Sequence, residues 1–441
     1  MSNPENSPTP TASADSYHNV SRAASEPPSG CPVVHAFSPL DKGYMNDPYT
    51  LTNRLRDTTP VFWAEEFGYL VVTRMEDINE VFLNPDVYSS ANVQDPVQPI
   101  CPAAQTVLAV DDFNPVAVMS NRQPPDHGRI RKYTRQGFSN RRMNLLEPYI
   151  RERAHALVDQ MLASGDGSGE GIDFVAAFGH PLPGEVIFRF IGFPEEYDAQ
   201  LKEWCSDRLA FSWGRPTPEE QEAIANKMLS YWRFVREFTA ERRDHPADDY
   251  ASEMIQAHLA NPDDISYREV ESVLYGLSFA GHEIVSNLLS NSLISLNPPS
   301  SDWDELVAEP SLIPNAVEEV IRWNSPQIGW RRIAKVDTKL GDVDIPAGTR
   351  IFLALGAANH QESEFPQPEV FDIHRENARF NISFGKGIHL CLGASLARLE
   401  GRVALEVLTE RIPTLRVVPN QELTYFPNVS FRGPTRLLVE W

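Results

Sequence analysis

Phe384-Gly385-Lys386-Gly387-Ile388-His389-Leu390-Cys391-Leu392-Gly393 is the stretch that decides the fold of this chain. Its cysteine stands between a glycine-rich turn and a helix-like run, Ala394 to Glu410. A thiolate at the start of a helix is stabilised by the positive end of the helix dipole and by free backbone N–H groups. Glycines at 385, 387 and 393 allow sharp turns and close approach of the backbone to a partner. We interpret Cys391 as a thiolate held by backbone donors and directed at a flat or cationic group. A lone cysteine without these neighbours would instead be interpreted as a small buried hydrophobe.

This segment resembles the haem-binding loop of the cytochrome P-450 superfamily, the haem-thiolate monooxygenases, in the form common among soluble bacterial members. The pattern Phe-Gly-x-Gly-x-His-x-Cys-x-Gly is matched at every fixed position, namely Phe384, Gly385, Gly387, His389, Cys391 and Gly393. The resemblance implies a b-type haem, iron protoporphyrin IX, with Cys391 as the ligand of the iron and His389 at a propionate. It also implies a mainly α fold with a small β region, built as one haem domain.

Composition limits the classes of partner. The 441 residues suffice for one large domain or two to three small ones, and 41% of them are hydrophobic. The formal net charge of −22 argues against nucleic acid or an anionic membrane as a partner. Four cysteines (Cys31, Cys101, Cys205 and Cys391) lie far apart without a disulfide framework, which fits the cytoplasm. No apolar run reaches the length of about 18 residues that spans a bilayer.

The chain divides into a tail and a domain. Residues 1–30 are rich in Ser, Pro and Ala and are predicted to be a disordered tail, and residues 31–441 carry the resemblance. The match is to a bacterial branch with self-sufficient members, whose haem domain continues into a flavin and iron–sulfur reductase. The sequence has neither the C-x₄-C-x₂-C spacing of an iron–sulfur cluster nor a dinucleotide fingerprint. We therefore expect either a stand-alone enzyme served by separate redox proteins or a chain that stops at the haem domain.

Apolar periodicity and turn residues give the expected elements. Helices are predicted at 47–56, 77–83, 145–162, 184–191, 194–213, 218–243, 265–296, 316–323 and 394–410. Strands are predicted at 61–63, 69–73, 332–334, 349–354 and 437–441. Prolines at 96, 99, 102 and 115 exclude a long helix between residues 88 and 125, and so long a loop is usually functional or disordered.

Pro124-Pro125 is interpreted as the start of another helix. His127 and Arg131 lie four residues apart and face the same way. Taken alone, with the basic residues around them, they indicate a solvated basic face. The resemblance implies instead that both bind a haem propionate, and that Arg332 reaches the propionates from the other side. Two cationic donors suit a carboxylate chemically.

The longest predicted helix, 265–296, carries the second part of the site. Ala280-Gly281 is interpreted as a bare patch against a flat body, followed by the polar pair His282-Glu283. The alternative is a kinked core helix with a satisfied histidine. The superfamily pattern Ala-Gly-x-Asp/Glu-Thr, its oxygen-activating groove, is matched at Ala280, Gly281 and Glu283, but Ile284 replaces the threonine.

Isoleucine cannot donate a hydrogen bond, so the usual threonine proton donor is absent. Water or a substrate hydroxyl supplies the proton path, or the enzyme uses peroxide, or it performs one-electron oxidation such as coupling; we favour the first. Glu283 is expected to belong to the proton relay.

Behind the haem, the resemblance implies a Glu-Arg-Arg network of Glu319, Arg322 and Arg375. The pocket is expected to be lined by the 88–119 loop, by two lid helices within 194–243, and by Leu277, Ile284 and residues 327–330. Trp330 is either a pocket wall or core. Because many of these positions are apolar, the expected substrate is a small-to-medium hydrophobic organic molecule.

The predicted function is a monooxygenase that inserts oxygen from O₂ by hydroxylation, dealkylation or epoxidation. Its electrons would come from a ferredoxin or flavin reductase. The alternatives are a peroxide-using or oxidative-coupling haem-thiolate enzyme, a non-catalytic haem sensor of gas or redox state, and a protein without haem.

Overall fold

The computed structural model describes residues 26–441, except 166–170, 206 and 298–300. The predicted disordered tail therefore lies, up to residue 25, outside the described residues. In the described part of the chain the α-helices are α1 (Lys42–Asn46), α2 (Pro48–Thr58), α3 (Met75–Leu83), α4 (Pro102–Leu108), α5 (Asp126–Thr134), α6 (Asn140–Ser164), α7 (Pro181–Ile191), α8 (Asp198–Cys205), α9 (Arg208–Trp213), α10 (Pro218–Asp244), α11 (Tyr250–Ala260), α12 (Tyr267–Leu296), α13 (Asp302–Ala308), α14 (Ile313–Trp323), α15 (Leu355–Ala358) and α16 (Ala394–Arg411).

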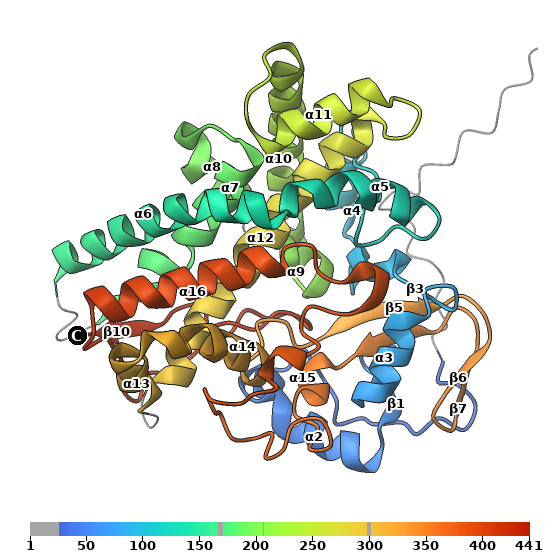
Figure 1. Ribbon diagram of the computed structural model, residues 1–441. Coiled ribbons are helices and arrows are strands. Elements are labelled where there is room, and N and C mark those ends of the chain that lie inside the picture. The colour runs from blue at the N-terminus through green and yellow to red at the C-terminus, as the bar shows by residue number, and fades with distance from the viewer. Residues whose placement is uncertain (1–25, 166–170, 206, 298–300) are drawn as a thin grey trace, which may run out of the picture.

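Among the described residues the strands form three separate sheets, and the largest of them lies at one side of the helices (Figure 1). They are β1 (Val61–Ala64), β2 (Tyr69–Val72), β3 (Tyr88–Ser89), β4 (Ile172–Asp173), β5 (Trp330–Ala334), β6 (Thr338–Leu340), β7 (Val343–Ile345), β8 (Arg350–Leu353), β9 (Arg416–Val417) and β10 (Leu438–Glu440). The main sheet has the order β1-β2-β8-β5-β3, and only β2 and β8 among its neighbours run parallel. The mainly α fold with a small β region is thus confirmed.

Helix α12 is positioned by its N-terminus. Ser266 and Glu269 form a capping box that satisfies two of the orphan N–H groups of the first turn. The Glu269 carboxylate also accepts hydrogen bonds from Arg122 and Arg129, both at 2.7 Å, which fixes α12 to α5 and to the segment before it. From there α12 passes between α7 and α16 through the middle of the helical part (Figure 1).

Most predicted elements are present, with one correction. Residues 194–213 do not form a single helix, because the chain breaks between α8 and α9, where Asp207 has a left-handed φ of 64°. The loop between residues 88 and 125 contains the short helix α4, with Pro102 in its first turn, where a missing N–H costs nothing. Among the described residues, no helix is long and apolar enough to cross a membrane.

Candidate functional site

The glycines of the 384–393 loop have different roles. Gly385 and Gly387 have φ angles of 68° and 70°, a region that side chains rarely adopt. A Cβ on Gly387 would also lie 2.8 Å from the carbonyl oxygen of Phe82. Gly393 has an ordinary φ of −80°, so the turn there does not need a left-handed backbone. Its lack of a side chain leaves room beside the sulfur, since a Cβ would lie 4.0 Å from Cys391 Sγ.

Cys391 ends this loop with its side chain open to a cavity inside the protein. Its backbone N–H donates to the Phe384 carbonyl at 2.9 Å, which closes the loop. Burial raises the pKa of the Cys391 thiol above its ordinary value, and the N–H groups of Gly393 and Ala394, with Arg131 and Arg398, act in the opposite direction. The thiol therefore has donors placed for a thiolate, and a bound metal ion would deprotonate it outright.

The cavity has a volume of about 300 Å³ and lies between the Cys391 loop and α12. Ala280 and Ile284 form part of its α12 wall. Of the residues predicted to border the substrate, Leu277 and Gln327 also line the cavity. Trp330 does so too, and its ring stacks on Trp213 of α9 at 5.0 Å between centroids, so it is both a wall and part of an aromatic cluster.

The bare patch on α12 is only partly what the sequence predicted. Ala280 and Gly281 both line the cavity, and Gly281 also packs on α7, where a Cβ would lie 2.6 Å from Cγ1 of Ile187. Its small size therefore serves close packing of two helices. The imidazole of His282 also points to α7, with Nε2 donating to the His180 carbonyl at 3.0 Å, which agrees with the alternative of a core histidine.

Glu283 points away from the cavity, toward the break between α8 and α9. The backbone N–H of Asp207 donates to its carboxyl group. Burial, followed by the negative charge of Asp207, raises the pKa of Glu283 to about 8. Arg208 and the Asp207 N–H oppose this shift. At neutral pH the carboxyl is therefore largely protonated, as a proton donor must be.

A cluster of cationic and imidazole side chains lies at the other edge of the cavity. Arg131 of α5, Arg332 of β5 and His389 line it, and the ring of His127 lies 4.2 Å from that of His389. Burial lowers the pKa of Arg332 to about 9, and no carboxylate among the described residues lies within ion-pair distance of it or of Arg131. Burial and these cations lower the pKa of His127 to about 4 and that of His389 to about 3.

The four members differ in their hydrogen bonds. His127 Nε2 is buried with no partner among the described residues. His389 is occupied, because Nδ1 donates to the Met119 carbonyl at 3.1 Å and Nε2 lies 3.2 Å from Ser90 Oγ. Arg131 Nη2 donates to the Leu390 carbonyl at 2.6 Å, next to Cys391. His127, Arg131 and Arg332 are thus the groups with donors to offer.

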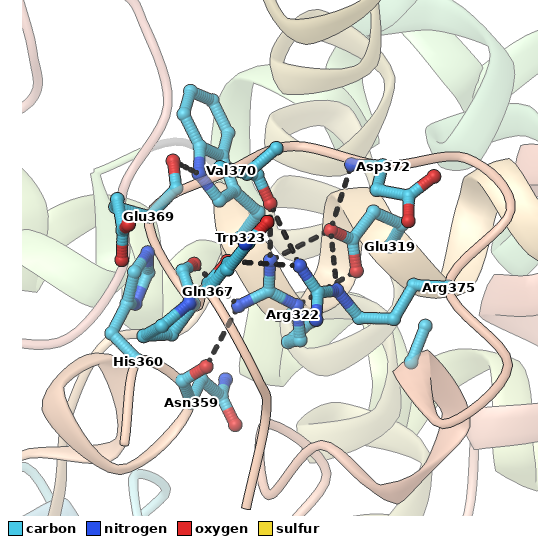
Figure 2. A network of polar contacts seen from close by, with 12 residues as sticks. Glu319, Arg322, Trp323, Asn359, His360, Gln367, Glu369, Val370, Asp372 and Arg375 are labelled. Carbon is cyan, nitrogen blue, oxygen red and sulfur yellow. Dashed lines mark hydrogen bonds and ion pairs between the residues drawn. The ribbon is translucent and has the colours of Figure 1, made fainter. Parts of the chain in front are cut away.

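Figure 2 shows the predicted Glu-Arg-Arg residues in direct contact. Arg322 binds Glu319 in bidentate fashion at 2.6 and 2.7 Å, and Arg375 Nε donates to the same carboxylate at 3.1 Å. Remaining guanidinium donors reach backbone carbonyls, among them those of Asn359 and Pro366. Glu319 and Arg322 are 0% exposed, so this network holds the segment after α15 against α14.

Two charged residues at the cavity were not singled out from the sequence. Arg208 of α9 and Glu400 of α16 both line it. Glu400 is fully buried and neither carboxyl oxygen has a hydrogen-bond partner among the described residues. The sequence does carry a signal by which both residues could have been found, namely a charged residue in an apolar helical run. Leu396, Leu399 and Val403 surround Glu400, and Leu209 to Trp213 follow Arg208.

These features fit a haem. A single thiol on one wall suits an iron that takes its other ligands from a macrocycle. The opposite wall presents a small side chain at Ala280. The buried, partnerless Nε2 of His127 and the uncompensated charges of Arg131 and Arg332 suit two carboxylates at one edge. Buried charges in proteins are normally paired, so this donor set predicts an anionic ligand.

Comparisons with known proteins agree. The family model described as Cytochrome P-450 matches residues 304–412. The biotin biosynthesis cytochrome P-450 of Bacillus subtilis is 32% identical over 92% of this chain and 98% of its own length. The structure of cytochrome P-450 CREJ in complex with (4-ethylphenyl) dihydrogen phosphate superposes with a TM-score of 0.88, at 36% identity, over 92% of this chain and 99% of that one.

An intact type IV self-sufficient cytochrome P-450 monooxygenase is also similar, with a TM-score of 0.90 and 35% identity. The match covers 94% of this chain and 54% of that protein. The fold, the cysteine loop and the cation cluster lead to the same assignment as these relatives. The chain belongs to the cytochrome P-450 family of haem-dependent monooxygenases.

Proposed function

We propose that this enzyme inserts one oxygen atom of O₂ into a small-to-medium hydrophobic organic substrate, with electrons delivered by a ferredoxin or flavin reductase. The observation that carries the proposal is the cavity of about 300 Å³ with Cys391 on one wall and a mostly apolar lining opposite. The four free cysteines favour a reducing compartment such as the cytoplasm.

Cys391 would hold the haem iron, and the haem supplies the activation of dioxygen when it is bound. Arg131, Arg332 and His127 would hold its propionates by charge-assisted hydrogen bonds. Both ring nitrogens of His389 already have partners, the Met119 carbonyl and Ser90 Oγ. The role that we assign to His389 is therefore to hold Met119 and Ser90 in place at the edge of the site. The Glu319, Arg322 and Arg375 network keeps the segment that precedes the cysteine loop in place.

Glu283 would hold a proton behind the α12 wall. It contacts Asp207, whose carboxylate pairs with Lys227 at 3.0 Å in a partly exposed position. The neighbourhood of Asp207 supports a proton path from solvent at the α8–α9 break through Glu283 toward the cavity. Because Ile284 offers no hydroxyl at the cavity wall, the last transfer requires a water molecule or a hydroxyl of the substrate.

Substrate size is suggested by the walls. Trp213, Trp330 and Phe279 line the cavity, and such rings bind planar apolar molecules well. The complex of the relative CREJ with (4-ethylphenyl) dihydrogen phosphate supports a substrate of one aromatic ring.

Ile284 favours a second candidate function, a peroxide-using or oxidative-coupling enzyme, because these chemistries do not need the hydroxyl that is missing. The two candidates are separated by turnover of a substrate library with O₂ and an electron donor against turnover with peroxide alone. The first proposal expects product mainly from the former, and product from peroxide alone would favour the second. CO binding and redox cycling without product from any compound would favour a sensor.

Ligation is tested by the absorption of the reduced CO complex. Wild-type protein should show the strongly red-shifted Soret band of a thiolate, and Cys391→Ser should lose that band completely while its far-ultraviolet circular dichroism is kept. Cys101→Ser is the matched control, because Cys101 caps α4 away from the cavity and serine can take over the cap. A red-shifted band in Cys391→Ser would mean that another residue binds the iron.

A further inference from the structure

Arg208 is a buried cation on the wall of the cavity. It is the first residue of α9, directly after the break at Asp207, and only 5% of it is exposed. It lines the cavity together with Phe279 and Ala280 of α12. Arg208 lies on the α12 side of the cavity. The cluster of Arg131, Arg332 and His389 lies at the other edge, where the haem propionates would be bound.

The guanidinium is held in one direction by its contacts. Nη1 donates to Ser212 Oγ at 2.6 Å, and Ser212 Oγ in turn donates to the Gln94 carbonyl at 2.9 Å. The guanidinium carbon lies 5.7 Å from the centre of the Phe279 ring. A planar guanidinium fixed in this way is preorganised, because little rotamer freedom remains to be lost on binding.

Two carboxyl groups, those of Asp207 and Glu283, lie in the neighbourhood of Arg208. The carboxylate of Asp207 is bound by Lys227 at 3.0 Å. Burial raises the pKa of Glu283 to about 8, so that this neighbouring carboxyl carries little charge at pH 7. A protein with a net charge of −22 repels anions over most of its surface, so an internal cation is a specific feature.

We propose that Arg208 binds an anionic oxygen group of the substrate, a carboxylate or a phosphate monoester, while the apolar part lies against the aromatic walls. The proposal rests on the proposed function and names its substrate class as one-ring amphiphilic anions. Arg208 would orient the molecule, with the anionic end at α9 and the apolar end toward the haem side of the cavity. In a water-poor site a charge-assisted, bidentate contact discriminates strongly against a neutral analogue.

The test uses the full-length haem-loaded protein and three matched probes, 4-ethylphenyl phosphate, 4-ethylbenzoate and neutral 4-ethylanisole. Dissociation constants come from isothermal calorimetry and from haem difference spectra, so turnover is not needed. We expect wild-type protein to bind at least one of the two anions ten times or more as tightly as the neutral probe. The anion that binds more tightly shows whether Arg208 selects a phosphate monoester or a carboxylate.

Arg208→Gln should reduce anion affinity at least tenfold and change that of 4-ethylanisole less than twofold, and Arg208→Lys should restore part of the loss. Arg215→Gln is the matched control, because Arg215 is in the same lid but at the surface, with Glu66 as its partner. It should leave all three constants unchanged.

The proposal is overturned if wild-type protein binds the neutral probe as tightly as both anions, which needs no variant to fold. It is also overturned if Arg208→Gln weakens all three probes equally, since that result indicates a structural partner of Glu283. Failure of the proposed function gives a different result, namely no haem uptake or no oxygenated product with any probe.

Discussion

Two groups of arginines in this protein, each with at least one fully buried member, have opposite surroundings. Arg322 and Arg375 share the carboxylate of Glu319, and their other donors reach backbone carbonyls. Arg131 and Arg332, at the cavity edge, have no carboxylate within ion-pair distance among the described residues. Both groups were expected from the same family pattern, and the sequence gives no sign of how differently they are satisfied.

The difference follows from the cost of burying charge. An ion pair with complete hydrogen bonding offsets much of its desolvation penalty, and breaking it leaves an uncompensated charge. A buried cation without a partner destabilises the fold until a ligand supplies the anion. The first group therefore acts on stability, and we interpret the second as acting on ligand binding, where stability is given up for affinity.

The largest effect is expected from removing the shared carboxylate. Glu319→Gln leaves two buried guanidinium groups without an anion and should lower the free energy of unfolding by about 3–5 kcal/mol. Urea denaturation followed by circular dichroism measures it. The adjacent Glu318→Gln is the control, because Glu318 and its partner Arg398 are partly exposed and should contribute about 1 kcal/mol or less. Equal losses from both variants would contradict the comparison.

The second group should respond with the opposite sign. Arg332→Met removes an unpaired buried cation and keeps an apolar stem of similar length, so the haem-free protein should be equally or more stable, by up to about 2 kcal/mol. Haem retention should fall at least tenfold, measured by the rate of haem transfer to excess apomyoglobin.

Arg331→Met is the matched control for this variant. Arg331 is the neighbouring residue, is fully buried, and donates to the carbonyls of Val93, Asp95 and Ser212. It should destabilise the protein with or without haem, because three backbone acceptors lose their donors. A haem-free Arg332→Met protein as unstable as Arg331→Met would remove the distinction between the two groups.

Much of the site could be predicted from sequence because it rests on local pattern. The positive φ values of Gly385 and Gly387, the capping box of α12 and the i,i+3 pair of Glu319 and Arg322 are all consequences of neighbours in the chain. The helix break at Asp207 is different, because it is stabilised by Lys227 from α10 and its N–H reaches Glu283 on α12. Periodicity carries no information about such partners.

Gly281 and Glu283 show the same limit at the level of direction. The pattern placed both on a helix beside the cavity, but Gly281 lines the cavity while also packing on Ile187 of α7, and Glu283 faces the break between α8 and α9. Which way a helical residue points depends on the rotation of the helix, and that is fixed by tertiary packing of α7 against α12. The role of Trp330, as a cavity wall or as core, could not be decided from the sequence for a related reason. Its ring stacks on that of Trp213, which comes from a distant segment of the chain.

Glu283 shows a third way to accommodate a buried charge, which is to keep a proton. Its pKa is raised from 4.5 to about 8, mainly by burial, so between these pH values the unfolded chain releases a proton that the folded chain retains. Glu283 should therefore lower stability progressively as the pH rises from 4.5 to 8, and Glu283→Gln should remove this slope.

Glu269 is the control of opposite sign: its pKa is lowered to about 2 by hydrogen bonds from Arg129 and the Ser266 N–H, against the effect of burial. Its stabilisation is present above pH 4.5 and is lost as the pH falls toward 2, so Glu269→Gln should flatten only the acid limb. Unfolding measured in urea from pH 3 to 9 separates the two, and a wild-type curve unchanged by Glu283→Gln above pH 5 would show that Glu283 is ionised in the folded protein.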